Sequence, residues 1–280
     1  MPGTILLGID VETAGESSAT YAQCGLEFLR RHGIRATWYV TGRTLERDPA
    51  LFVAADRSGL IDLEAHTYDH ILLKSVLTEI PPGCTVCGQT GVFFKRGGSL
   101  AAIDADLARC QGVFENVLGR GPRGLTGPWA YYRGLGDRPD LLELVYGYGY
   151  RFVRTFGRDA RDGQPVPMEW QPAFYGPQGF PDLLELMIHD YQDDYLFMEF
   201  TGAADASAYP VHLRGVADRV AAEDLVWSLC SHDHHCETPE SFAAKTAWLD
   251  GLVGYARSLG IRFLTGSEYY EERMAAAGRR

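Results

Sequence analysis

The sequence is poor in positive charge, and lysine in particular is scarce. Its 280 residues contain 26 Lys and Arg against 37 Asp and Glu, so the formal net charge is −11 at pH 7. Only Lys74, Lys95 and Lys245 are lysines. Proteins that bind nucleic acid or anionic membranes need a surplus of basic residues on one face. The charge balance therefore argues against both as the main partner.

From the sequence we expect neither a transmembrane span nor a secretory leader. A transmembrane helix needs roughly 20 mainly apolar residues, and the sequence contains no such run. The opening MPGTILLGID carries no basic segment, and its apolar run meets Asp10 too soon for a signal peptide. We therefore expect a cytoplasmic protein whose six cysteines are reduced thiols.

Strand and helix patterns alternate along the chain. The apolar runs 4–10, 34–40 and 61–66 indicate buried strands. The segments 17–32 and 44–58 between them indicate helices, the second interrupted early by Pro49. This alternation predicts right-handed crossovers and a parallel sheet. The pattern continues with helices at 99–118, 141–146 and 242–259, and with strands at 123–126, 151–155, 183–188, 195–200, 225–230 and 261–264.

The count of seven or eight strands favours an α/β fold, a distorted β/α barrel, over two domains. No repeat and no linker rich in Pro or Ser divides the chain, so residues 1–280 are interpreted as a single domain. From about 77 to 98 the pattern gives way to PPGCTVCGQTG and KRGG, which predicts an inserted loop. Its Cys84 and Cys87 are interpreted either as two ordinary thiols or as half of a structural zinc site; a redox pair fits less well.

Reactive side chains follow the ends of several predicted strands, where functional groups gather in parallel α/β folds. Asp10 and Glu12 follow the first strand, His66 and His70 the third, and His232 a late one. If the chain turns helical after the third strand, the two imidazoles share one face. Two histidines and a carboxylate are a ligand set for a catalytic divalent metal, and the second carboxylate can serve as base for a water molecule.

These motifs resemble those of the polysaccharide deacetylase superfamily, the NodB-homology group also called carbohydrate esterase family four. IDVET resembles its first motif, HTYDH its second, and SLCSHDHH its last, in the family's order. ATWYVTG and FLTGSEY resemble the strand before the second motif and the usual C-terminus. The resemblance covers nearly the whole chain. It implies the family's distorted seven- or eight-stranded β/α barrel and metal-dependent N-deacetylation.

The resemblance also implies a role for each motif residue. Asp10 corresponds to the general base, and Glu12, His66 and His70 correspond to the metal ligands. His232 corresponds to the general acid that protonates the leaving amine. The expected metal is Zn²⁺, with Co²⁺, Ni²⁺ or Fe²⁺ as alternatives.

His234 and His235 compete with His232 for the acid role, and His232 is preferred because it lies nearest the strand end.

Three positions depart from the family pattern. Glu12 stands where the family usually has Asp, and Thr126 stands where an Arg usually holds the base. Arg133 or Arg123 is then expected to supply that charge. IHDYQDDY, which contains His189, occupies about the place of a Trp near the acyl pocket. These departures indicate a diverged member, with an unusual substrate as the main interpretation and lost activity as the alternative.

Aromatic side chains in Gly- and Pro-rich segments are expected around the mouth of the site, where their faces suit a sugar ring or a flat small molecule. We predict that the substrate contacts are made by Thr126, Trp129, Tyr131, Arg133, His189 and His234.

The predicted function is a metal-dependent amide hydrolase that removes an N-acyl group, mainly acetyl, from an amino sugar, a glycoside or another small N-acylated metabolite. One alternative is a deformylase or cyclic amidase of the same superfamily. A second is a binding homologue without catalysis. We expect a small-molecule partner, neither nucleic acid nor membrane, and find no sequence argument for an oligomer.

Overall fold

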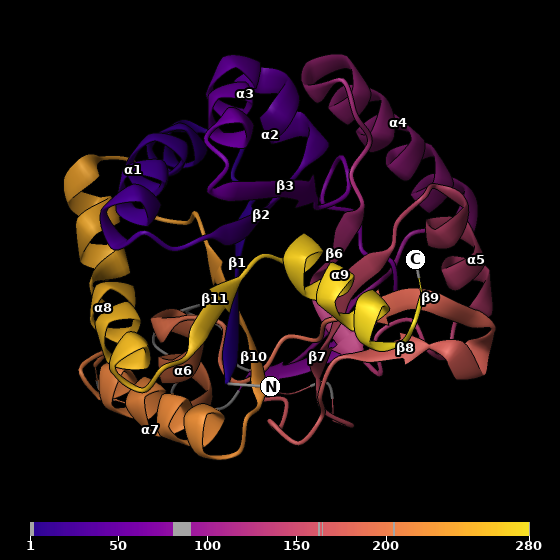
Figure 1. Ribbon diagram of the computed structural model, residues 1–280. Coiled ribbons are helices and arrows are strands. Elements are labelled where there is room, and N and C mark those ends of the chain that lie inside the picture. The colour runs from indigo at the N-terminus through magenta and orange to yellow at the C-terminus, as the bar shows by residue number, and fades with distance from the viewer. Residues whose placement is uncertain (1–2, 81–90, 162, 164, 204, 280) are drawn as a thin grey trace.

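The computed structural model describes residues 3–80, 91–161, 163, 165–203 and 205–279 (Figure 1). Its main sheet runs in the order β10-β1-β2-β3-β6-β7-β9-β8, and β11 also pairs with β1. Neighbouring strands in this sheet are parallel except β8 and β9. The strands are β1 (Thr4–Val11), β2 (Ala36–Val40), β3 (Ile61–Ala65), β6 (Gly124–Tyr132), β7 (Phe152–Arg158), β8 (Ala173–Tyr175), β9 (Phe180–Glu185), β10 (Val226–His232) and β11 (Arg262–Leu264).

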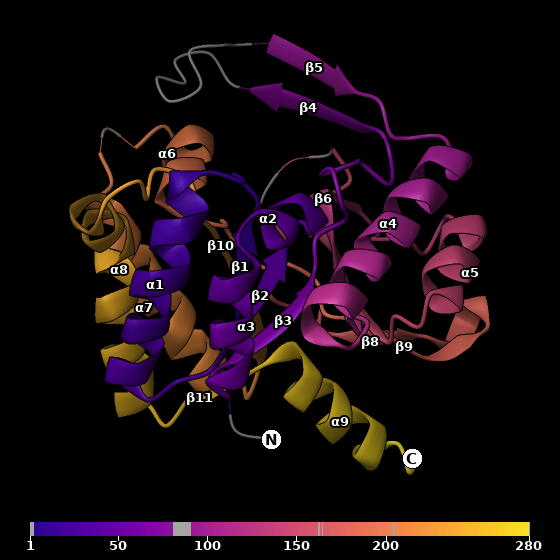
Figure 2. The ribbon, with the colours of Figure 1, turned by 90° about the horizontal axis from the view of Figure 1, so that it is seen from above.

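Helices surround these strands on the outside (Figure 1). One helix, α9, lies at the end of the molecule opposite the hairpin of β4 (Val76–Ile80) and β5 (Gly91–Lys95) (Figure 2). Its Tyr269 packs with Leu6, Tyr39 and Phe152 from the strands. No helix in the described ranges is both long and apolar enough to cross a bilayer. The helices are α1 (Glu16–His32), α2 (Gly42–Arg47), α3 (Pro49–Arg57), α4 (Leu100–Leu118), α5 (Pro139–Gly147), α6 (Asp194–Thr201), α7 (Ala208–Ala222), α8 (Pro239–Ser258) and α9 (Gly266–Ala276), with a 3₁₀ turn η1 (Gly176–Gln178).

His189 and Gln171 connect the two ends of the main sheet, the end that carries β9 and β8 and the end that carries β10. His189 follows β9, donates its backbone N–H to the Ser228 carbonyl (3.0 Å), and accepts the Ser228 N–H at Nδ1 (3.0 Å). The Gln171 amide accepts the Val226 N–H (2.8 Å) and donates to the Val226 carbonyl (3.1 Å). These bonds pair the backbone groups of Val226 and Ser228 in β10. The α/β architecture is the expected distorted β/α barrel.

The side chain of His189 has a structural role at this contact between the segment after β9 and β10. Its side chain is fully buried, and Nε2 donates to the Trp170 carbonyl. Both ring nitrogens therefore bond backbone groups, so the geometry does not support the predicted substrate contact. Burial is the main cause that lowers the pKa of His189 to about 4. The His189 imidazole is therefore neutral at physiological pH, and its role is structural.

We expect His189→Gln to reduce the acid sensitivity of the fold. The unfolded chain takes up a proton near pH 6.5, whereas the folded imidazole resists it down to about pH 4. Stability due to this group is therefore present above pH 6.5 and falls by up to roughly 3 kcal/mol as the pH drops toward 4. Glutamine keeps a donor and an acceptor but does not titrate. Urea unfolding at pH 7 and 4.5 measures the effect.

The control for this variant is His235→Gln, because His235 is exposed. It should leave the pH dependence of the unfolding free energy as in the wild type. A difference between wild type and His189→Gln that is the same at both pH values would contradict the assignment.

One predicted element was wrong in type, and a second is divided where the sequence indicates an interruption. Residues 195–200, expected as a strand, belong to helix α6, because Asp193 caps its N-terminus by accepting the Leu196 N–H and Gly202 ends it in the left-handed conformation. The segment 44–58 is helical as expected, and the expected interruption at Pro49 divides it into α2 and α3, because Pro49 begins a new helix.

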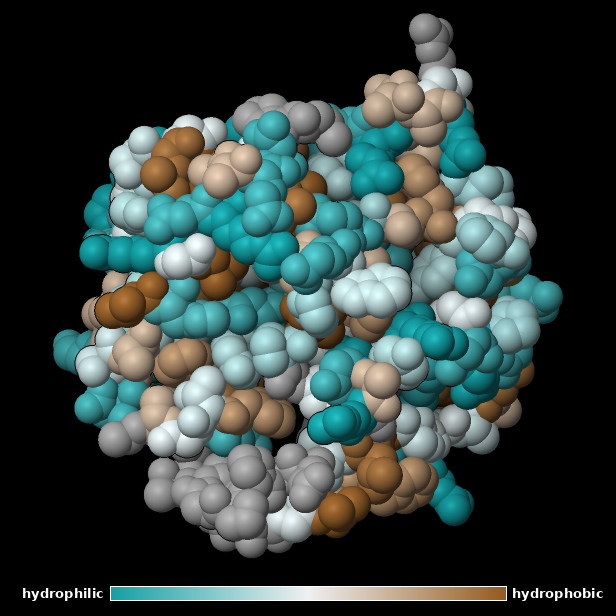
Figure 3. Space-filling view, turned by 90° about the horizontal axis from the view of Figure 1, so that it is seen from below, coloured by the Kyte–Doolittle hydropathy of each residue, from teal (hydrophilic) through white to brown (hydrophobic). Residues whose placement is uncertain are grey.

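The segment expected as a loop at 77–98 contains an antiparallel hairpin, β4 (Val76–Ile80) and β5 (Gly91–Lys95), which projects beyond the barrel (Figure 2). Opposite residues such as Thr78 and Phe93 share one face and line a pocket. The other face carries Leu77, Val92 and Phe94, each more than half exposed. Hydrophobic side chains gather near the lower edge of the space-filling view (Figure 3). Cys84 and Cys87 lie outside the described residues.

Candidate functional site

A pocket of about 490 Å³ lies between the C-terminal ends of the strands and the hairpin. Its size is typical of a small-molecule site. Asp10 and His232 pair in register on β1 and β10, so both reach this end of the sheet. The predicted site residues that line the pocket are Asp10, Glu12, His66, His70, Trp129, His232 and His234.

Glu12 lies at the centre of three imidazoles. Its Oε2 is 2.7 Å from His66 Nε2 and 2.9 Å from His70 Nε2, and its Oε1 is 2.8 Å from His234 Nε2. Glu12, His66 and His70 are thus brought together as predicted, and His234 joins them from the segment after β10. Burial acts to raise the pKa of Glu12, but hydrogen bonds from the three histidines hold it well below its usual value.

Local turns, not a helix, bring these ligands together. After β3 the chain passes through Thr67 and His70 in the left-handed region (φ 58° and 57°), so the expected helical spacing is wrong. The Asp106 carboxylate stabilises this turn by accepting the N–H groups of Tyr68 (2.6 Å) and Asp69 (2.9 Å).

A second local contact positions Glu12. The side chain of Asp233, after β10, accepts the N–H (3.3 Å) and the hydroxyl (3.0 Å) of Thr13, after β1. This contact holds the Glu12 and His234 segments side by side.

The protonation pattern of His66 fits a metal site. Its Nδ1 lies 3.2 Å from the Thr126 carbonyl oxygen, which can only accept, so Nδ1 carries the proton. A neutral His66 then presents a bare Nε2 lone pair to the Glu12 carboxylate. Two acceptors at 2.7 Å repel each other unless a proton or a cation lies between them. The donor set Glu12, His66 and His70 therefore fits a divalent cation, with His234 within reach.

Asp10 is held by a buried arginine that sequence reasoning missed. Arg154 on β7 is fully buried and donates to Asp10 Oδ1. Thr126 Oγ1 accepts from Arg154 Nε (3.1 Å) and donates to the Arg154 carbonyl (2.9 Å). Gly8 leaves space for the guanidinium, since a Cβ there would lie 2.3 Å from it. Thr126 is thus a support for Arg154, and it does not line the pocket.

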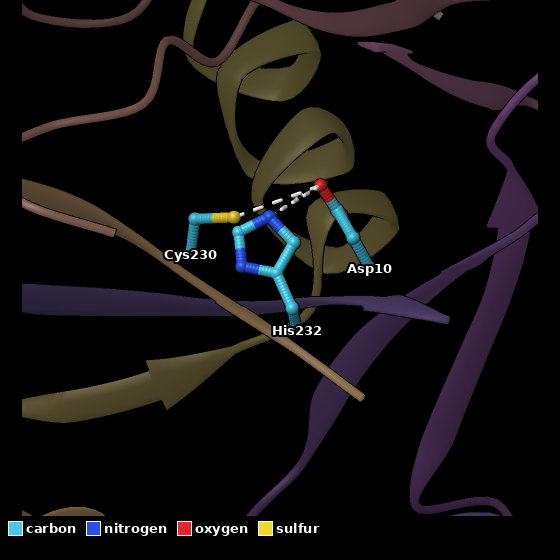
Figure 4. A group of neighbouring side chains, drawn as sticks. All are labelled: Asp10, Cys230 and His232. Atoms are coloured by element: carbon cyan, nitrogen blue, oxygen red, sulfur yellow. Dashed lines mark hydrogen bonds and ion pairs between the residues drawn. The ribbon is translucent and has the colours of Figure 1, made fainter. Parts of the chain in front are cut away.

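The other oxygen of Asp10 faces the pocket. Oδ2 lies 3.9 Å from His66 Nε2, 4.0 Å from His232 Nε2 and 3.6 Å from the Cys230 thiol. Figure 4 shows Cys230 and His232 converging on this oxygen. One carboxylate oxygen is therefore fixed by Arg154, while the other is available on the side of the ligand cluster.

Arg133 and Arg123, the two arginines expected to hold Asp10, lie elsewhere. Arg123 pairs with Glu271 (2.6 Å), and Arg133 packs on the Tyr132 ring. Tyr131 is buried, with its hydroxyl accepting the Leu73 N–H (2.8 Å). Among the described residues, neither Tyr131 nor Arg133 lines the pocket, so the geometry does not support their predicted substrate contacts.

His232 is paired with a buried carboxylate. Its Nδ1 lies 3.0 Å from Asp193 Oδ2, and Lys245 Nζ lies 3.7 Å from the same oxygen. Burial acts to lower the pKa of His232, but the hydrogen bond and charge of Asp193 outweigh it and raise the pKa to about 9. Burial likewise acts to raise the pKa of Asp193, while His232 and Lys245 lower it. The imidazole is protonated at neutral pH, with Nε2 directed to the pocket.

Arg154 and Asp193 are the two functional residues that sequence reasoning missed. Asp193 lies within IHDYQDDY, the segment at about the place of the family's Trp near the acyl pocket. Its carboxylate was the available sign of a functional role. Arg154 lies in a predicted strand, where a charged residue amid apolar neighbours was the available signal.

Comparisons with known proteins agree with this architecture. The family model described as polysaccharide deacetylase matches residues 4–149. No curated protein sequence matches the chain. Solved structures with the same fold include a putative polysaccharide deacetylase from Mycobacterium smegmatis, with 16% identity, TM-score 0.66, and 99% of this chain and 91% of that chain covered.

Two further solved structures share the fold. The Puue allantoinase has 15% identity and TM-score 0.68, with 97% of this chain and 90% of that chain covered. A CE4 family pseudoenzyme from Bacillus anthracis has 14% identity and TM-score 0.52, with 96% of this chain and 66% of that chain covered. At these identities the likeness concerns the fold alone.

Proposed function

The chain belongs to the polysaccharide deacetylase family, and we propose that it is a metal-dependent amide hydrolase that removes an N-acyl group, first of all acetyl, from a small substrate. The substrate classes that we propose are an amino sugar, a glycoside or another N-acylated metabolite. The proposal is carried by one observation. Asp10 Oδ2 lies 3.9 Å from His66 of the ligand cluster and 4.0 Å from His232, so a base and an acid flank one reaction centre.

Glu12, His66 and His70 would hold the metal, for which Zn²⁺ is the first candidate and Co²⁺, Ni²⁺ and Fe²⁺ are alternatives. Such a cation supplies Lewis-acid polarisation of the acyl carbonyl. Asp10 takes the proton of the attacking water at Oδ2, because Arg154 occupies Oδ1. His232 is protonated through its pairing with Asp193 and donates its Nε2 proton to the leaving nitrogen.

Metal removal tests this proposal. We expect the zinc-loaded wild type to release acetate from an N-acetyl substrate, to stop after dialysis against a chelator, and to recover when zinc is returned. His66→Ala should bind less than about a tenth of an equivalent, because losing one of three ligands removes most of the affinity. Elemental analysis and acetate release are the two measurements. His32→Ala is the control, since His32 lies on α1 and contacts Asp250.

The products separate the remaining candidates. Formate in place of acetate would indicate a deformylase, and ring opening without a released acid would indicate a cyclic amidase. A protein that binds substrate without turnover would be an inactive homologue. Activity that survives complete metal removal would reject the proposal itself.

A further inference from the structure

Trp129 projects into the pocket from a strained part of β6. The register between β6 and β7 shifts between Thr126 and Tyr131, and Trp129 and Ala130 both have positive φ (68° and 50°). Non-glycine residues in this region cost about 1 kcal/mol or more each, and such strain gathers at functional sites. Arg158 Nε donates to the Trp129 carbonyl (2.9 Å) and holds the segment. The Trp129 side chain is 37% exposed, which marks a contact surface.

Two cations lie against the Trp129 indole. Lys95 Nζ of the hairpin is 5.5 Å from the ring centroid, and the Arg158 guanidinium is 5.7 Å from it. Both side chains also line the pocket. Arg158 is buried close to the Glu199 carboxylate: burial raises the pKa of Glu199, and the charge of Arg158 acts to lower it. Arg158 therefore has an acidic neighbour within the pocket.

Lys95 differs from the two other lysines. Lys74 pairs with Asp137 and Lys245 pairs with Asp193. Within the described ranges, Lys95 forms no ion pair, and its contact is the Trp129 ring. Outside the described residues, the segment 81–90 next to Lys95 contains no Asp or Glu, and Asp162 is the one acid. The acids at the other end of the pocket have their own partners, Arg154 for Asp10 and the imidazoles for Glu12.

We propose that this pocket takes an N-acylated substrate that carries an anionic group, a carboxylate or a phosphate, and that Lys95 binds this group. The inference rests on the proposed function and names its substrate class. An ammonium on a flexible stem suits either anion. In a chain of net charge −11, a lysine that has no ion pair among the described residues and lies against the Trp129 indole creates a local positive site at the pocket. The hairpin that carries Lys95 also roofs the pocket through Thr78 and Phe93, which favours a small ligand.

The test compares neutral and anionic probes on zinc-loaded protein: N-acetylglucosamine, N-acetylglucosamine 6-phosphate and N-acetylmuramic acid. Turnover gives kcat/KM, and titration calorimetry gives Kd independently of turnover. We expect the wild type to prefer at least one anionic probe about tenfold over the neutral one. The favoured probe shows whether the anion is a phosphate or a carboxylate.

Lys95→Met should reduce this preference about tenfold, mainly through KM and Kd, and Lys95→Arg should retain most of it. The matched control is Arg96→Met, which removes one positive charge from the next, exposed position outside the pocket lining. It should keep the wild-type preference. Raising the salt concentration should weaken the preference in wild type and leave it unchanged in Lys95→Met.

The outcomes separate this inference from the proposed function. Lys95-dependent binding of an anionic probe without its hydrolysis would keep the inference and reject the function. Hydrolysis without a preference for anionic probes would keep the function and overturn the inference. Equal losses in Lys95→Met and Arg96→Met, or no binding of either anionic probe, would also overturn it.

Discussion

Replacing Asp10 by Asn is expected to abolish turnover while the protein keeps its metal. The amide retains the size of the carboxylate but cannot take a proton from water. A general base of this kind contributes about 100- to 10,000-fold to the rate. Metal content should remain near one equivalent, because the ligand cluster is built on Glu12, His66 and His70 and Asp10 lies beside it. Acetate release and elemental analysis on the same sample measure both effects.

The matched control is Asp62→Asn. Asp62 is a carboxylate on β3 that bonds Ser267 outside the pocket, so its amide variant should retain turnover. Asp10→Asn with more than about a tenth of wild-type activity would show that Asp10 is not the base. Loss of metal in Asp10→Asn would instead make Asp10 a ligand.

Arg154, which holds Asp10, could not be predicted from the sequence motifs. The family resemblance places an arginine at position 126, and the chain has threonine there. β6 and β7 pair in a register that sets Thr126 directly beside Arg154, so the guanidinium reaches Asp10 from the neighbouring strand. The two positions are 28 residues apart in the chain. Only the strand pairing shows that they are neighbours, and no motif carries that information.

For His189, in contrast, the sequence predicts a contact with substrate that the structure does not support. In the fold its Nδ1 bonds Ser228 of β10 and its Nε2 bonds the Trp170 carbonyl. The strand ends were predictable because their apolar runs are long and end in acids or imidazoles. Short apolar runs such as 195–200 fit a strand or a buried helix equally, and the cap at Asp193 decides for a helix.

The Asp193–His232 pair is expected to set the pH dependence of the reaction rate. We expect Asp193→Asn to move the alkaline limb of the pH–rate profile down by about two pH units. A general acid works in its protonated form, so activity is present below its pKa and is lost as the pH rises through it. Asp193 is the main reason that the pKa of His232 is raised, against burial, to about 9. A bound cation acts in the opposite direction, so the wild-type limb should lie at or below pH 9.

Asp193→Asn removes the negative charge beside His232 and is expected to preserve the structure of α6. Asn also caps helices well, so α6 should keep the hydrogen bond that Asp193 accepts from Leu196. Without the Asp193 carboxylate, only the weaker charges of Glu12 and Asp10 still act to raise the pKa of His232 against burial. Turnover at pH 8 should therefore fall at least tenfold. The pH dependence of kcat/KM and the unfolding free energy are the measurements. The pair also stabilises the fold below pH 6.5, and this contribution is lost as the pH rises through about 9.

The control is Asp190→Asn, because Asp190 also bonds a histidine, His212 (2.7 Å), but does not line the pocket. Its alkaline limb should coincide with that of the wild type, since the His212 pair lies outside the reaction centre. An unchanged limb in Asp193→Asn, or an equal shift in both variants, would remove His232 as the acid. His234 would then be the next candidate, because it is the other imidazole of the late motif that lines the pocket.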